Sequence, residues 1–159
     1  MEGTIADGLN QIRTQLDELW DYELWANRKW LPHLARFQDS ARAEAVFRHI
    51  LRAQETWLRR AWSEEDSGEW PTELEAAVDF GAQQWRTFIR MCDPEAFVSY
   101  TNQAGDPFFQ TVEQITRHVL NHGTYHRGHL RGLAMAEGWD DFDDTDLIRY
   151  YREKATCPS

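Results

Sequence analysis

The chain has 159 residues and a formal net charge of -10, from 17 Lys and Arg against 27 Asp and Glu. So acidic a surface repels phosphate backbones and anionic lipid headgroups, and we expect neither a nucleic-acid nor a membrane partner. Cys92 and Cys157 form neither a disulfide framework nor a zinc-finger spacing. No leader-like or membrane-spanning run is found, so we predict a cytoplasmic protein with a single domain over residues 1–159.

Two amphipathic helices are predicted in the first part of the chain. Apolar residues recur at helical spacing over residues 9–37, with a kink or break expected near Pro32. Ser40 can cap a second helix, whose apolar stripe continues to Ala61. The acidic segment 63–68 then contains a glycine, and we interpret it as a turn.

A third helix is predicted from the capping box Thr72-x-x-Glu75 to Asp93-Pro94. The helical period is then lost, and residues 95–110 are expected to form a small hairpin or a loop.

A fourth helix is predicted from the capping box Thr111-x-x-Gln114 to a stop at Gly138. Asp143 or Asp144 can then cap a short C-terminal helix. We therefore predict an all-α fold: a four-helix bundle with a short irregular or hairpin excursion between helices three and four and a short C-terminal helix.

Four of the six histidines lie on the fourth predicted helix, within an arc of about 80°. They are His118, His122, His126 and His129. The apolar stripe of this helix is centred nearest His126, so His126 and His122 are expected at core positions. An i, i+4 pair can direct two imidazoles at one ion. His118 and His129 are expected beside the ligands or at the surface.

A third ligand has to come from another helix. His49 lies at the margin of the apolar stripe of the second helix, whereas His33 lies near the end of the first, so His49 is the better candidate. Histidines that are merely hydrogen-bonded in the core are the alternative. No HExxH motif and no ferritin-like Glu-x-x-His spacing occurs, so the predicted site is mononuclear.

Two charged positions bear on this site. Glu23 falls about 20° from the centre of the apolar stripe of the first helix, where an unpaired carboxylate would be costly. It either orients an imidazole N–H or lies on an exposed part of the helix. On the fourth helix, the face that carries Arg127 is expected to point away from the core.

Three segments together resemble the DinB-like, or damage-inducible-protein-like, family of metal-binding four-helix bundles. The segments are Tyr22-Glu-Leu-Trp25-Ala-Asn27, His49-Ile-Leu-Arg-Ala-Gln-Glu-Thr-Trp57-Leu and His118-Val-Leu-Asn121-His122-Gly-Thr124-Tyr-His126-Arg127-Gly128. The resemblance implies that His49, His122 and His126 bind one divalent ion. The family's frequent Gln after His-Arg-Gly is His129 here.

Further residues of these segments are expected around the ligands. They are Trp25, Asn27, Asn121 and Tyr125, of which Trp25 and Tyr125 could equally be packing residues. The resemblance and the amount of aromatic surface that one bundle must cover also predict a homodimer.

Three neutral imidazoles leave a divalent ion at least one open position, as in catalytic sites. Zn, Ni, Fe and Co all suit such a set. The ion could lower the pKa of a bound water for hydrolysis, or hold a thiol as the thiolate for transfer to an electrophile. The resemblance favours the second route, since the family includes enzymes similar to thiol transferases and isomerases that use bacillithiol, mycothiol or glutathione. A metal-dependent hydrolase and a non-catalytic stress-response module are the alternatives.

Overall fold

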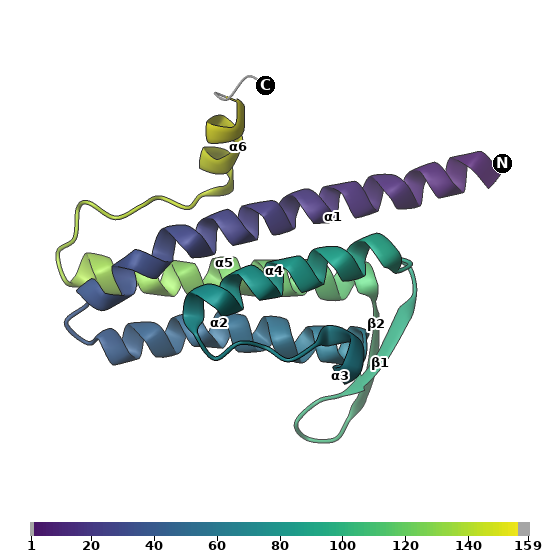
Figure 1. Ribbon diagram of the computed structural model, residues 1–159, viewed down its shortest axis with the longest axis horizontal. Coiled ribbons are helices and arrows are strands. Elements are labelled where there is room, and N and C mark those ends of the chain that lie inside the picture. Colours follow the sequence, from purple (N-terminus) through teal and green to yellow (C-terminus); the bar gives the residue numbers. More distant parts are fainter. Residues whose placement is uncertain (1, 156–159) are drawn as a thin grey trace.

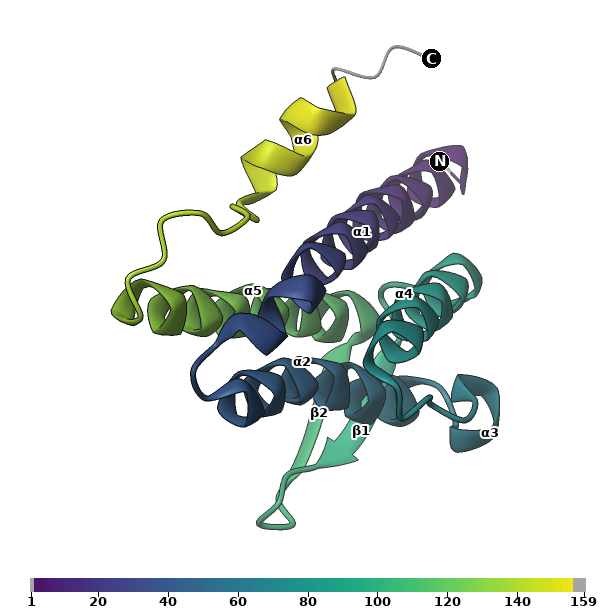
Figure 2. The ribbon, with the colours of Figure 1, turned by 60° about the vertical axis from the view of Figure 1, so that its left-hand side comes forward.

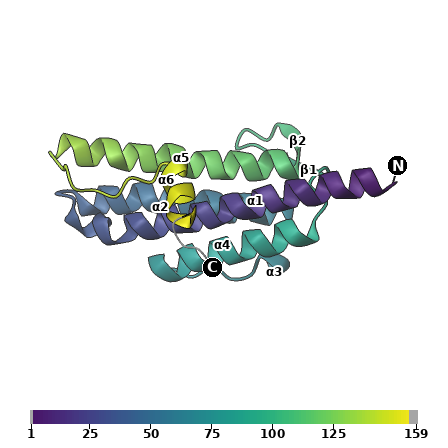
Figure 3. The same cartoon turned by 90° about the horizontal axis from the view of Figure 1, so that it is seen from above.

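The computed structural model describes residues 2–155 and is mostly helical, with one two-stranded sheet (Figure 1). Its four long helices are α1 (Glu2–Trp30), α2 (Ser40–Ala61), α4 (Leu74–Met91) and α5 (Val112–Ala136). They lie side by side, and contacts join α1 to α4, α4 to α2, α2 to α5 and α5 to α1 (Figure 3). The predicted predominance of helix is confirmed. None of the described helices is both long and apolar enough to cross a membrane.

The first helix is longer than its apolar pattern indicates. It begins at Glu2 rather than near residue 9, and its first turns extend beyond the other helices (Figure 1). Ile5 is 67% exposed there, so no buried stripe could mark this start. The break expected near Pro32 is confirmed, because the 3-10 helix η1 (Leu31–Arg36) follows, with a proline in its first turn.

The predicted helix caps are partly wrong. The cap of α2 is Asp39 and not Ser40, and that of α4 is Glu73 rather than the predicted Thr72. In both cases a carboxylate accepts a backbone N–H of the first turn at 2.9 Å. A carboxylate also complements the positive end of the helix dipole, which a hydroxyl does not. The capping box at Thr111 is confirmed on α5.

Two connections are more regular than predicted. The segment interpreted as a turn contains the single-turn helix α3 (Glu64–Ser67), which Ser63 caps. Residues 95–110 contain most of an antiparallel hairpin of β1 (Phe97–Thr101) and β2 (Pro107–Thr111). The predicted hairpin is therefore confirmed, and it lies beside the C-terminal end of α2 and the start of α5 (Figure 1).

The C-terminal helix α6 (Leu147–Ala155) begins later than Asp143 or Asp144. It projects away from the four long helices and contacts α1 (Figure 2). Tyr150 fixes it there, since this side chain is buried against Tyr22 and Ala26 of α1.

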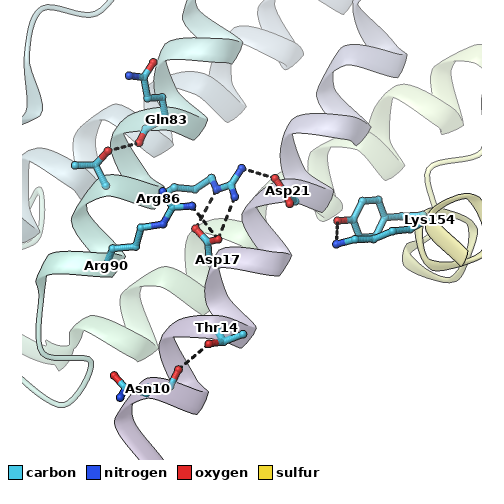
Figure 4. Close-up of polar contacts among 10 residues, drawn as sticks. Asn10, Thr14, Asp17, Asp21, Gln83, Arg86, Arg90 and Lys154 are labelled. Carbon is cyan, nitrogen blue, oxygen red and sulfur yellow. Dashed lines mark hydrogen bonds and ion pairs between the residues drawn. The ribbon is translucent and has the colours of Figure 1, made fainter. Parts of the chain in front are cut away.

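The interior of the four helices is apolar and rich in tryptophan. Trp20 of α1 stacks on Trp85 of α4 with ring centroids 5.1 Å apart, and both are fully buried. On the outside of the same helix pair, Asp17 accepts hydrogen bonds from Arg86 and Arg90 (Figure 4). This packing holds α1 and α4 together and leaves the α2–α5 pair to carry the histidines.

Candidate metal centre

The antiparallel pair α2 and α5 brings three predicted ligands together. His49 comes from α2, and His122 and His126 come from successive turns of α5. The His49 ring centroid lies 4.9 Å from that of His122 and 4.5 Å from that of His126. One nitrogen of each ring can be chosen so that all three lie within 4.8 Å of one another. The three side chains are therefore close enough to hold a metal ion.

The cluster lies at a solvent-open seam and not at core positions. His49 is exposed, and His122 and His126 are half-buried. The expectation that the α5 pair occupies the core is corrected because the buried face of α5 runs through Gly123 and Arg127 instead. Rotated in this way, the helix turns its histidines towards α2 and leaves one side of the cluster open.

The surroundings of the α5 pair favour the neutral imidazole. Burial lowers the pKa of His122 to about 4, and the neighbouring histidines His126, His49 and His118 add to the effect. Burial also lowers the pKa of His126, with further contributions from His49 and His129. Both rings are therefore uncharged at neutral pH and offer the lone pairs that a metal ion requires.

One ring nitrogen lacks a partner within the chain. His122 Nδ1 is buried and accepts or donates no hydrogen bond among the described residues. Four other buried side-chain nitrogens are also unpartnered, but each is an indole or guanidinium N–H, which can only donate. His122 Nδ1 is the member of this set that can present a lone pair. Three imidazoles, each with a ring nitrogen that can accept a metal, form a donor set that fits a divalent ion.

Glu23 fits neither predicted alternative. It is buried, and its carboxylate accepts hydrogen bonds from Arg127 at 2.8 Å, Gln54 at 3.0 Å and Asn27 at 3.2 Å. No imidazole is among these partners. The carboxylate instead joins α1, α2 and α5 in one buried network.

The expectation that Arg127 points away from the core is wrong. Its side chain is 2% exposed, and it donates to Glu23 and to the amide oxygen of Asn27. Burial alone would lower the pKa of Arg127, but the Glu23 carboxylate outweighs this and raises the pKa, so the guanidinium stays charged. The buried Glu23–Arg127 ion pair therefore occupies a position where a hydropathy pattern would predict apolar residues.

The network also requires a glycine at position 123. A Cβ added at Gly123 would lie 2.3 Å from Glu23 Oε1, so the bound carboxylate occupies the space that a side chain at position 123 would need. Sequence reasoning missed Gly123, Arg127 and Gln54 as a structural unit. The signal in the sequence was Glu23, a carboxylate at an apolar-stripe position of the first helix. Such a position implies a buried partner but does not identify it.

The remaining predicted residues divide into two groups. His118 and Tyr125 lie beside the cluster, with ring centroids 6.0 Å from His122 and 5.1 Å from His126 respectively. His129 is exposed but near enough to His126 to affect its pKa.

The second group lies elsewhere. Trp25 packs on Tyr22 and Tyr150 and donates to Glu153, which corrects its placement near the ligands. Asn121 is exposed on the side of α5 that faces α1 and the segment before α6, away from the histidines.

The fold and these distances define a helical protein with a three-histidine cluster that can hold a metal ion. Comparisons of the chain with models of protein families, with curated proteins and with solved structures gave no significant match.

Proposed function

We propose that the chain is a divalent-metal protein of the DinB-like type, with His49, His122 and His126 as ligands of one ion. The observation that carries the proposal is the convergence of one ring nitrogen from each of the three histidines, all within 4.8 Å of one another. The ring of contacts among α1, α2, α4 and α5 supports a four-helix bundle of that type. The motifs around the three histidines support the family.

We propose further that the protein is an enzyme with S-transferase-like activity that acts through a low-molecular-weight thiol on an electrophile. When bound, a divalent ion supplies positive charge that stabilises an anionic nucleophile at neutral pH. The chain contributes neutral ligands, which do not cancel that charge, and an open side beside exposed His49 for the thiol and the electrophile. A free thiol with a pKa of about 8.5 is mostly protonated at neutral pH, so such stabilisation would matter.

The proposal extends to a homodimer in the cytoplasm, without a nucleic-acid or membrane partner. The net charge of -10 supports the last two expectations. Light scattering that gives the mass of one chain at micromolar concentration would contradict the dimer.

The direct test is elemental analysis of the purified protein. We expect about one divalent ion per chain, and its loss from His122→Ala and from His126→Ala. His33→Ala is the matched control, because His33 hydrogen-bonds Asp143 and Arg36 in a different part of the molecule. Unchanged metal content in both α5 variants would show that the ligands are assigned wrongly.

The chemistry is tested separately on the cobalt-substituted protein. Bacillithiol, mycothiol, glutathione and cysteine are added in turn, and a sulfur-to-cobalt charge-transfer band is expected with at least one of them. If no thiol gives a band while activated esters are hydrolysed, the hydrolase alternative replaces the transferase. If neither reaction occurs, the non-catalytic metal-binding module replaces both.

A further inference from the structure

A small pocket adjoins the histidine cluster on the side of the β-hairpin. It has a volume of about 240 Å³ and lies between α2, the hairpin and the start of α5. Its lining consists of three aromatic rings, two amides and one aliphatic side chain: Trp57, Tyr100, His118, Gln110, Gln114 and Ile115. None of the three proposed metal ligands lines this pocket.

The walls of the pocket are rings held at fixed angles. Trp57 meets Tyr100 edge to face at 4.9 Å and meets His118 in the same manner at 5.1 Å. The guanidinium of Arg60 lies over both Trp57 and Tyr100, at 4.6 Å and 5.2 Å from their centroids. Cation–π contacts of this kind brace the two rings from one side.

The hairpin fixes the remaining wall. Tyr100 stacks on Phe108 of the opposite strand, and its hydroxyl donates to Gln110. Gln114 is held by the capping box of α5, where its side-chain oxygen accepts the backbone N–H of Thr111. A pocket whose walls are held in this way loses little freedom when a ligand enters.

The size and lining of the pocket select a flat aromatic ligand. A cavity of about 150 Å³ accommodates benzene, so 240 Å³ accepts one ring or a fused pair. Rings that meet at steep angles offer a bound ring both stacked and edge-to-face contacts, which a saturated ring of the same size cannot reproduce.

His118 lies between the pocket and the histidine cluster. This side chain lines the pocket and lies 6.0 Å from the His122 ring, centroid to centroid. Since α2 and α5 are antiparallel, His49 of α2 lies beside His122 of α5, and Trp57 of α2 lies beside His118 of α5. A molecule that lies along this seam can therefore place one end at the cluster and the other in the pocket.

We propose that this pocket is the recognition subsite of the histidine cluster and binds a one-ring or fused two-ring aromatic group of the electrophilic substrate. The inference rests on the proposed function for the reaction at the cluster, whereas the aromatic preference rests on Trp57, Tyr100 and His118 alone. It names the class of substrate as an electrophile that carries an aromatic group.

Fluorine NMR on the full chain tests the aromatic preference, with para-fluorophenol as the probe and fluorocyclohexanol as its saturated counterpart. We expect the protein to broaden the phenol signal preferentially. Trp57→Leu and Tyr100→Leu should each weaken phenol binding roughly fivefold to tenfold. Phe109→Leu is the matched control, because Phe109 is 66% exposed and lies next to Phe108, on the opposite face of the hairpin from Tyr100.

Cobalt(II) separates this inference from the proposed function. In the cobalt-loaded protein, relaxation of the bound phenol should be enhanced, and in His122→Ala the enhancement should vanish while binding persists. Equal binding by wild type and Trp57→Leu, or equal binding of the two probes, would overturn the subsite. Phenol binding without any enhancement from bound cobalt would also overturn it. Failure of the wild type to bind cobalt would contradict the proposed function and leave the pocket to be judged by the variants.

Discussion

Two polar clusters lie on neighbouring residues of α5 and differ in burial and in whether opposite charges meet within the chain. Arg127 follows His126 directly, and Gly123 follows His122. Towards α1, the carboxylate of Glu23 accepts three hydrogen bonds in a sealed interior. Towards α2, the three histidines contact one another, and His122 Nδ1 has no partner among the described residues.

The comparison shows how a structural polar cluster is distinguished from a ligand site. Both are groups of ionisable residues between helices, but the Glu23 cluster is buried whereas the histidines lie at a solvent-open seam. In the Glu23 cluster opposite charges cancel, whereas the histidine cluster contains only groups of one type that would repel one another if protonated. A cluster of that second kind has uncharged nitrogens at neutral pH and can accept a cation from outside the chain.

We call the buried group around Glu23 and Arg127 the closed cluster and the three histidines the open cluster. The largest effect on stability is expected from a substitution in the closed cluster. Arg127→Met leaves the carboxylate of Glu23 buried without its counter-charge, which should lower the free energy of unfolding by about 3–5 kcal/mol. Urea unfolding followed by circular dichroism at neutral pH measures the loss.

The double variant Glu23→Gln with Arg127→Met is the control for this prediction. A glutamine oxygen can still accept from Gln54 and Asn27, so the double variant should recover much of the stability lost by Arg127→Met alone. A single variant that costs less than about 1 kcal/mol would mean that the ion pair is not sealed from water.

The next effect in size concerns the close approach of α1 to α5. Gly123→Ala forces a Cβ to within 2.3 Å of Glu23 Oε1, and overpacking of this kind costs about 1–3 kcal/mol. Gly128→Ala on the same helix meets nothing within 4 Å and should instead stabilise the protein by up to about 1 kcal/mol. Thermal unfolding of the two variants should therefore shift in opposite directions, and equal shifts would contradict the packing described for Gly123.

The sequence predicted the open cluster better than the closed one, for a physical reason. His122 and His126 converge because of a spacing within one helix, and His49 follows from one position on a second apolar stripe. The contact of Glu23 with Arg127 joins residues 104 apart and depends on how two helices are rotated about their axes. Because Arg127 is charged, the apolar pattern of α5 does not include it in the buried face and therefore predicts the histidines deeper than they lie.

A third cluster, formed by Asp17, Arg86 and Arg90, is less buried than the closed cluster. It tests how burial affects the contribution of an ion pair to stability. Asp17 is 24% exposed and Arg86 25%. Partial burial opposes ionisation of Asp17, but Arg86 and Arg90 outweigh it and lower its pKa below 3.8 (Figure 4). Asp17→Asn should therefore cost about 1–2 kcal/mol at neutral pH, between the losses expected for a sealed and an exposed pair.

The pH dependence supplies the control for Asp17. A carboxyl whose pKa is lower in the folded state stabilises the fold above pH 3.8, and this contribution is lost as pH falls through the folded-state pKa. The difference in unfolding free energy between wild type and Asp17→Asn should thus shrink in acid. A difference that stays constant from neutral pH to acid would show that the arginines do not act through the charge of Asp17.

The smallest change is expected at the edge of the open cluster. His118 is exposed and lies against Trp57 and His122, so His118→Ala should alter the unfolding free energy by no more than about 0.5 kcal/mol. It should also keep most of its metal, because His118 is not among the three ligands of the proposed site. His49→Ala, which also replaces an exposed histidine, should lose the metal with a similarly small change in the stability of the metal-free protein. Elemental analysis and unfolding of both variants, prepared in parallel, measure the two quantities independently. Equal losses of metal would place His118 among the ligands, and the open cluster would then extend over a further turn of α5.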